Sequence, residues 1–156
     1  MKVCFLGVDG SGKTTLALFS KDYLGDTVYL HAEQLRTFPI MVWKKSRAKN
    51  VICDGYLFDY FVTVFSKVLY RRCKLSRIIV KLLSFFDRFD LVFYLECPWE
   101  VTKNRTSDIN FEDYEKRVWL YNVVNEVIMP VMVDTDEDIN QTKLVISIYL
   151  DGEDKR

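Results

Sequence analysis

The sequence has a single histidine, His31, and no two cysteines in a C-x-x-C arrangement. A metal site with several histidine ligands is therefore excluded. Three of the four cysteines lie within or beside apolar runs, which favours buried free thiols in a reducing cytosol. We therefore expect neither a histidine-rich metal site nor a set of structural disulfides.

The sequence also has no excess charge of either sign, with 22 basic and 22 acidic residues. No general electrostatic attraction to nucleic acid or to an anionic membrane is therefore expected. No apolar run is long enough to span a bilayer, and the first predicted strand begins at once, with no signal peptide before it. These absences predict a cytoplasmic protein with neither nucleic acid nor a membrane as its partner.

The chain is long enough to form one domain with a substantial core. It has 156 residues, of which 49% are hydrophobic and 28% charged, as in an ordinary soluble globular protein. It contains no internal repeat and no low-complexity linker. The sequence therefore predicts a single domain over residues 1–156.

Short apolar runs alternate with segments of helical periodicity along the chain. This alternation predicts the α/β class, with a parallel five-stranded sheet covered by helices on both faces, in three layers. Ligands of such sheets bind at the carboxyl ends of the strands, so Asp9, His31 and Asp54 are expected along one rim. The predicted strands are 3–6, 27–30, 51–54, 90–95 and 131–133. The predicted helices are 14–24, 56–72, 75–86, 98–105, 111–128 and 139–150, followed by a frayed tail over 151–156.

Residues 7–15 read GVDGSGKTT and fit the phosphate-binding pattern G-x-x-x-x-G-K-[ST]. They lie between a predicted strand and a predicted helix, which is the context that this motif requires. The glycines let successive backbone N–H groups point at a polyphosphate, and the positive end of the helix favours the same anion. Lys13 would contact the β- and γ-phosphates, and the Thr14 hydroxyl would bind Mg²⁺. The predicted nucleotide-binding residues are Gly10, Ser11, Gly12, Lys13, Thr14 and Thr15.

The motif is shared by kinases, GTPases and ATP-driven motors, which other features separate. A GTPase would need an Asn-Lys-x-Asp segment to recognise guanine, and no asparagine of this chain is followed by lysine. The D-x-x-G match over residues 22–25 lies at the end of a predicted helix instead of after a strand. A motor or transporter ATPase would carry further signature motifs, which this sequence lacks. A small-molecule kinase is the class that remains.

The phosphate loop also resembles that of thymidylate kinases, whose form G-x-[DE]-G-x-G-K-[ST]-T is narrower than the general motif. Residues 51–56 (VICDGY) are similar to that family's strand ending in Asp-Arg-Tyr. Residues 90–101 (DLVFYLECPWEV) resemble its strand-to-helix unit, and residues 105–121 resemble its lid and the following helix. The resemblance implies a P-loop NTPase fold of the kinase type, ATP and Mg²⁺ as cofactors, and a short lid around residues 105–112.

Two departures from that family concern the phosphoryl acceptor. Gly55 stands where the family has the arginine that holds the acceptor's 5′-phosphate, and the region between Pro39 and Asp54 is shorter than the family's. A nucleoside or a non-nucleotide metabolite is therefore an alternative acceptor to a nucleotide. A non-catalytic nucleotide-binding regulator is an alternative from a different functional class.

Two carboxylates and an arginine are candidate catalytic residues besides Lys13. Asp9 lies inside the phosphate loop, and the resemblance implies that it binds the acceptor hydroxyl; the alternative is a solvent-facing loop residue. Asp54 ends a strand, where it could hold Mg²⁺, accept a proton from the attacking hydroxyl, or cap the next helix. Arg105 could neutralise charge on the transferred phosphoryl group, with Arg117 as a weaker candidate for the same role.

Three further residues are candidate acceptor contacts. Arg36 could replace the arginine that is missing at Gly55, or it could be a surface charge. Tyr56 could face a ring-shaped substrate, although most aromatic residues of that helix are expected in the core. His31 ends a strand at the rim, where a structural histidine is the more common alternative.

Together these features predict ATP-dependent phosphoryl transfer to a small acceptor. The resemblance favours thymidylate, with dTMP and ATP giving dTDP and ADP, over the alternatives given above. A homodimer through the apolar helix at residues 56–69 is a further hypothesis, since thymidylate kinases commonly form dimers through helices packed on the sheet.

Overall fold

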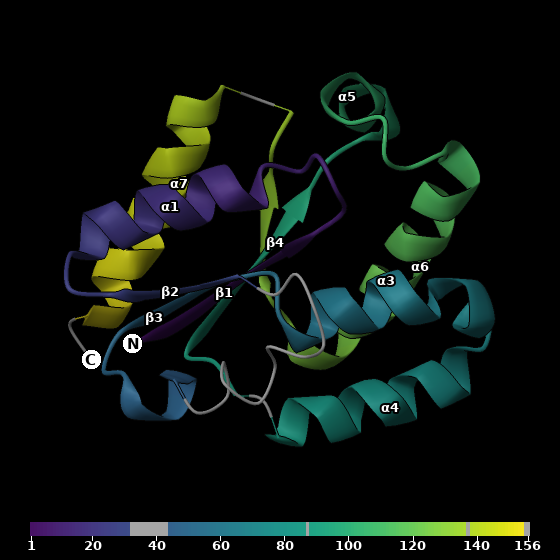
Figure 1. Cartoon of the computed structure of the whole chain (residues 1–156), viewed down its shortest axis with the longest axis horizontal. Coiled ribbons are helices and arrows are strands. Elements are labelled where there is room, and N and C mark those ends of the chain that lie inside the picture. Colours follow the sequence, from purple (N-terminus) through teal and green to yellow (C-terminus); the bar gives the residue numbers. More distant parts are fainter. Residues whose placement is uncertain (32–43, 87, 137, 155–156) are drawn as a thin grey trace.

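Five parallel strands form the centre of the protein, in the spatial order β2-β3-β1-β4-β5 (Figure 1). The computed structural model describes residues 1–31, 44–86, 88–136 and 138–154. All five predicted strands are confirmed. The strands are β1 (Lys2–Gly7), β2 (Val28–His31), β3 (Val51–Asp54), β4 (Leu91–Glu96) and β5 (Val131–Asp134).

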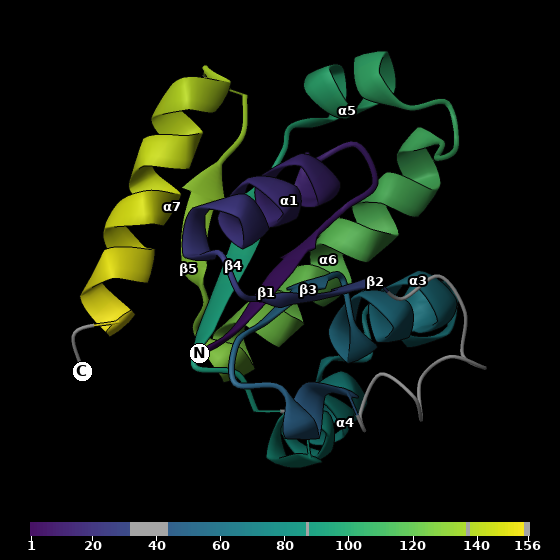
Figure 2. The ribbon, with the colours of Figure 1, turned by 60° about the vertical axis from the view of Figure 1, so that its left-hand side comes forward.

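Helices cover both faces of the sheet, which confirms the predicted three-layer α/β architecture (Figures 1 and 2). One face carries α1 and α7, and the other carries α3, α4 and α6, while α5 follows the carboxyl end of β4. Their bounds are α1 (Lys13–Leu24), α3 (Leu57–Leu69), α4 (Cys73–Phe86), α5 (Trp99–Arg105), α6 (Phe111–Ile128) and α7 (Ile139–Asp154).

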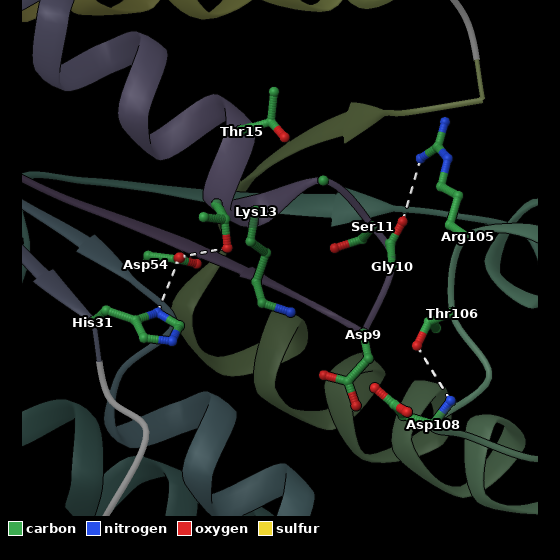
Figure 3. A pocket seen from close by; sticks show the side chains of 12 residues that line it. Asp9, Gly10, Ser11, Lys13, Thr15, His31, Asp54, Arg105, Thr106 and Asp108 are labelled. Atoms are coloured by element: carbon green, nitrogen blue, oxygen red, sulfur yellow. Dashed lines mark hydrogen bonds and ion pairs between the residues drawn. The ribbon is translucent and has the colours of Figure 1, made fainter.

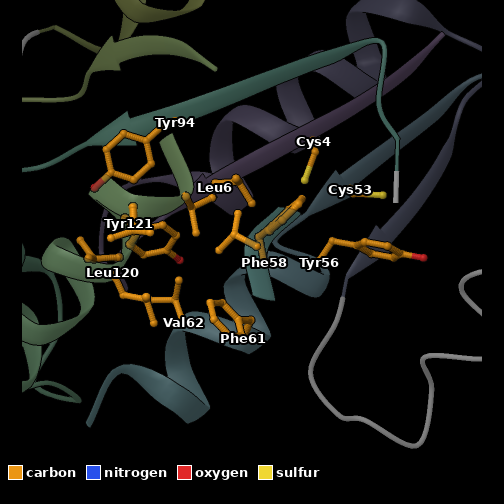
Figure 4. Packing of buried hydrophobic residues seen from close by; sticks show 14 of the residues in the cluster. Cys4, Leu6, Cys53, Tyr56, Phe58, Phe61, Val62, Tyr94, Leu120 and Tyr121 are labelled. Carbon is orange, nitrogen blue, oxygen red and sulfur yellow. The ribbon is translucent and has the colours of Figure 1, made fainter. Parts of the chain in front are cut away.

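β1 lies in the middle of the sheet and is buried on both faces, which explains its uninterrupted apolar sequence. Val3 and Phe5 belong to the core under α1 and α7. Cys4 and Leu6 belong to the opposite core, with residues of α3 and α6 (Figure 4). The two cores together fix the position at which β1 ends and the phosphate loop begins.

The helix ends follow the predicted boundaries within two residues, except that α3 ends at Leu69 instead of at residue 72 and that α7 continues past residue 150. α7 continues to Asp154, so the fraying predicted from Asp151 onward is wrong for residues 151–154. The Tyr23 hydroxyl of α1 donates to Asp151 Oδ1 at 2.9 Å, which links this part of α7 to α1. Within the part of the chain that is described, no helix combines the length and apolar character needed to cross a membrane.

Because all five strands are parallel, their carboxyl ends meet at one edge of the sheet. Gly7, His31, Asp54 and Glu96 are the last residues of β1, β2, β3 and β4. The phosphate loop follows the central strand. The predicted rim is therefore confirmed, and it contains the candidate site.

Candidate active site

The phosphate loop joins the end of β1 to the start of α1, in the context that the motif requires. The loop packs tightly at Gly7, where an added Cβ would lie 2.6 Å from Ser11 Oγ and 2.8 Å from the carbonyl oxygen of Leu95. The Ser11 backbone N–H donates to the Val8 carbonyl at 3.1 Å and closes the turn. A side chain at Gly7 would therefore push the loop away from β4.

A cavity of about 450 Å³ opens beside this loop (Figure 3), and its size is typical of small-molecule sites. The predicted nucleotide-binding residues, 10–15, all line it. The predicted catalytic residues Asp9, Asp54 and Arg105 line it too, so the structure brings together residues that lie far apart in the sequence. The other lining residues are His31, Thr106 and Asp108.

The Lys13 ammonium group is folded back onto the phosphate loop. It donates to the carbonyl oxygens of Gly7 and Val8, at 2.6 and 3.0 Å. It also forms an ion pair with Asp59, with 3.4 Å between Lys13 Nζ and Asp59 Oδ2. A cation is thus held at the floor of the cavity, where phosphate oxygens could replace these partners.

Asp54 is buried at the end of β3, and its two carboxylate oxygens differ in their surroundings. Oδ2 accepts hydrogen bonds from the hydroxyls of Thr14 and Tyr29, both at 2.7 Å, and lies 3.0 Å from His31 Nδ1. Burial and the nearby Asp54 carboxylate raise the pKa of Tyr29, so its phenol keeps its proton and donates. Oδ1 is buried, and no residue of the described chain donates to it.

These oxygen atoms fit a Mg²⁺ ion. Mg²⁺ prefers oxygen ligands and binds to proteins through one or two side chains together with phosphate oxygens and water. The Thr14 hydroxyl and the buried Asp54 Oδ1 match that pattern. Among the described residues there is no group of three or more His, Cys, Asp or Glu that could hold a metal ion alone. Phosphate and water would therefore complete the coordination of an ion at this place.

Asp9 extends from the phosphate loop and forms an ion pair with Arg117 of α6. Arg117, the weaker of the two arginine candidates from the sequence, is the one that contacts a candidate catalytic carboxylate. The positive charge of Arg117 offsets the negative charge of Asp9 beside a site for phosphates. The Asp9 side chain is still 48% exposed, which leaves part of the carboxylate open to a ligand.

Asp59, in the first turn of α3, was not predicted as a site residue from the sequence. Its Oδ1 accepts from the Tyr121 hydroxyl at 2.6 Å and from the Gly7 backbone N–H at 3.4 Å, while Oδ2 contacts Lys13. Burial raises the pKa of Asp59, and those three partners oppose the rise. The only signal in the sequence is a lone carboxylate at the start of a strongly apolar helix.

The position of Asp59 also helps to explain why residue 55 is a glycine. Gly55 has φ +61°, in the left-handed region that favours glycine. An added Cβ would lie 2.7 Å from Asp59 Oδ2. An arginine at Gly55, as in thymidylate kinases, would therefore need a different backbone and the displacement of Asp59.

We expect the Asp59→Asn variant to be more stable than the wild type at neutral pH, with the advantage disappearing in acid. The folded protein holds the Asp59 proton more tightly than the unfolded chain, because burial raises the pKa. Ionisation of Asp59 therefore lowers the free energy of unfolding as the pH rises from about 4 and passes the raised pKa of this group in the folded protein. Asparagine has no proton to lose and avoids this decrease.

Urea unfolding at a series of pH values measures this effect as the difference between Asp59→Asn and the wild type. Asp22→Asn removes an exposed carboxylate from α1 and controls for the change in net charge. A difference between Asp59→Asn and the wild type that stays constant with pH would contradict the prediction.

Arg105 connects the phosphate loop to the segment after β5. Its guanidinium donates to the Gly10 carbonyl at 3.3 Å and to the Thr135 carbonyl at 2.9 Å. A second cavity of about 280 Å³ shares Arg105 with the first one, so this side chain lies between two spaces that could hold parts of one ligand. The second cavity is lined by Ser11, Gly12, Thr15, Leu16, Arg105, Thr135, Ile139 and Thr142.

The prediction that Tyr56 contacts the acceptor is corrected by the structure. Tyr56 is 1% exposed and packs edge-on against Phe89, with 5.6 Å between the ring centroids. The Lys45 ammonium lies over the same ring, and Tyr56 is not among the residues that line either cavity. It is a core residue (Figure 4). Arg36, the other predicted acceptor contact, lies outside the described residues.

Three similar solved structures are of deoxyadenosine kinase from M. mycoides. The structure with bound dATP has a TM-score of 0.69 at 18% identity, over 97% of this chain and 99% of that chain. The structure with the products dCMP and a flexible dCDP gives 0.68 at 19% identity, over 97% and 100%. The structure with bound dCTP gives 0.65 at 21% identity, also over 97% and 100%. The chain has the P-loop kinase fold.

No model of a known protein family matches the sequence, and no curated protein matches it either. At the identities given above, the likeness to the solved structures establishes the fold alone. The more specific resemblance to thymidylate kinases stays a prediction.

Proposed function

We propose that this protein is an ATP-dependent kinase that phosphorylates a hydroxyl group of a nucleoside. The proposal rests on one observation: Lys13 and the hydrogen-bonded pair of Thr14 and Asp54 line the same cavity, at the carboxyl edge of the sheet. A phosphate loop alone binds a nucleotide, while the added carboxylate equips the site for Mg²⁺-dependent transfer. The deoxyadenosine kinase structures with the same fold support a nucleoside as acceptor.

In this mechanism the protein contributes position and charge. The Lys13 ammonium leaves the loop carbonyls and contacts the β- and γ-phosphates, which the loop N–H groups also bind. Thr14 and Asp54 would hold Mg²⁺, which offsets the charge of the phosphates when it is bound. The exposed part of the Asp9 carboxylate accepts a hydrogen bond from the acceptor hydroxyl and orients its oxygen toward the γ-phosphate.

The two cavities suggest where the two substrates bind. The second cavity, beside Arg105 and Thr135, would take the base of ATP, because it shares the end of the phosphate loop with the first. Asp9 lines only the first cavity, on the side where the acceptor would then bind. Residues 105–112 would close over the transferred group as a lid, since Thr106 and Asp108 already line the first cavity.

Thymidylate is the second candidate acceptor. It is favoured by Asp9, which stands in a loop of the thymidylate kinase form and is positioned by Arg117. Gly55 and Asp59 favour the nucleoside instead, because a buried carboxyl group offers no positive charge to an acceptor phosphate. We therefore place the unphosphorylated acceptor first.

Release of ADP in the presence of different acceptors tests the proposal. The panel consists of the deoxynucleosides, the ribonucleosides, the nucleoside monophosphates including thymidylate, and a set of sugars and polyols. We expect turnover with at least one nucleoside, and weaker or no turnover with the matching monophosphate. The Lys13→Ala variant controls for contaminating kinases.

Each other outcome selects a different function. Turnover with thymidylate alone would support the thymidylate kinase hypothesis and show that another cation replaces the missing arginine. Turnover with sugars alone would indicate a metabolite kinase. Binding of ATP without any turnover would favour the non-catalytic nucleotide-binding regulator.

A further inference from the structure

Although the whole chain has no net charge, one of its segments is strongly basic. No aspartate or glutamate occurs between Asp59 and Asp87. This segment comprises most of α3 and all of α4. The net charge of zero therefore says little about the surface that α4 presents. The basic residues of this segment are Lys67, Arg71, Arg72, Lys74, Arg77 and Lys81.

α4 has an apolar stripe that the fold leaves exposed. Its inner side, with Ser76 and Val80, is buried against the rest of the protein. On another side of the helix, Leu75, Ile78 and Leu82 are 45%, 58% and 58% exposed. Their i, i+3, i+7 spacing aligns them along the helix. Figures 1 and 2 show α4 at the margin of the molecule, far from the phosphate loop.

Cations border this stripe. Lys74 and Lys81 are exposed and lie one helical turn on either side of Ile78. No acidic side chain of the described residues pairs with either of them, whereas Arg77 pairs with Glu126 of α6. An apolar stripe bordered by unneutralised lysines is typical of helices that lie at the surface of anionic membranes.

We propose that α4 docks onto an anionic lipid surface. Leu75, Ile78 and Leu82 would enter the headgroup region, while Lys74 and Lys81 contact lipid phosphates. A second copy of this chain fits less well. A two-fold interface uses the same surface of both copies, so it would bring two basic helices together. This inference does not depend on the proposed kinase activity.

α7 provides a matched control surface. Leu144 and Ile148 on this helix are 61% and 62% exposed, which is close to the values for Ile78 and Leu82. The ends of α7 carry acidic residues, including Asp138 just before it and Asp151 within it. If apolar exposure alone caused binding to lipid, both helices would contribute. If the basic border matters, only α4 should.

Cosedimentation with lipid vesicles tests the proposal. We expect the wild type to sediment with vesicles that contain phosphatidylglycerol but not with vesicles of phosphatidylcholine alone. The double variant Ile78→Glu/Leu82→Glu should lower the bound fraction at least about tenfold. Lys74→Gln/Lys81→Gln should also lower it about tenfold or more. The double variant Leu144→Glu/Ile148→Glu should bind like the wild type.

Circular dichroism and thermal melting verify that each variant is folded, which is expected because all substituted side chains are exposed. Failure of the folded wild type to bind phosphatidylglycerol vesicles would overturn the proposal. Equal binding to phosphatidylcholine vesicles would also overturn it, and so would an equal loss in the α7 variant. A dimer in light scattering that Ile78→Glu/Leu82→Glu dissociates would assign this face to a second copy of the chain instead.

Discussion

Replacing Lys13 with methionine is expected to lower kcat for phosphoryl transfer by at least about a hundredfold. Methionine has nearly the same length but no charge, so it cannot neutralise the negative charge that moves through the phosphates during transfer. It also leaves Asp59 without its ion-pair partner at the floor of the cavity. The kinetic constants would be measured with the acceptor that the ADP-release panel identifies, and ATP binding would be measured in parallel.

Lys21→Met is the matched control, because it makes the same chemical change in the last turn of the same helix, α1. That variant should keep the wild-type kcat. If Lys13→Met also kept it, Lys13 would not contact the transferred phosphate, and the proposed mechanism would fail even if the protein still bound ATP.

Replacing Gly55 with arginine is expected to lower the free energy of unfolding by about 2–4 kcal/mol and to restore no activity toward thymidylate. Two effects add at this position. The left-handed backbone at φ +61° strains any residue that has a Cβ, and this Cβ would overlap Asp59 Oδ2 at 2.7 Å. The thymidylate kinase hypothesis instead expects Gly55→Arg to retain or raise activity on thymidylate.

Alanine variants separate the two effects in urea unfolding experiments. Gly12 has φ +90° and ψ +13°, in the left-handed helical region, and nothing lies within 4 Å of an added Cβ. Gly12→Ala therefore measures the backbone strain alone, and Gly55→Ala should be more destabilising. Adding Asp59→Ala to Gly55→Ala should recover part of the difference. Equal effects at Gly12 and Gly55 would refute the role assigned to Asp59.

The fold could be predicted from the sequence because its signals are local. Each strand is a short apolar run, and the phosphate loop is a contiguous motif whose neighbours fix its place at the end of β1. The parallel arrangement then brings Asp54 to the Thr14 hydroxyl across forty residues of sequence. The rule that ligands bind at strand carboxyl ends was enough to place Asp54 on the same rim as the phosphate loop.

Contacts between helices and the loop could not be predicted in the same way. Asp59 and Tyr121 meet Gly7 from α3 and α6, and nothing in their local sequence indicates which side of each helix faces the loop. The same limit applies to the contact between Arg117 of α6 and Asp9, which the sequence did not indicate. Tyr56 was assigned to the rim from its closeness to Asp54 in sequence, although its side chain turns into the core.

The position of β1 has a consequence for the order in which the protein can form during synthesis. β1 leaves the ribosome before its two neighbours in the sheet, β3 and β4, which begin at Val51 and Leu91. This buried central strand is therefore made well before both of its edges can be paired. Such non-local pairing is slow and exposes apolar surface to aggregation. The nascent chain is consequently expected to need a chaperone until β4 has emerged.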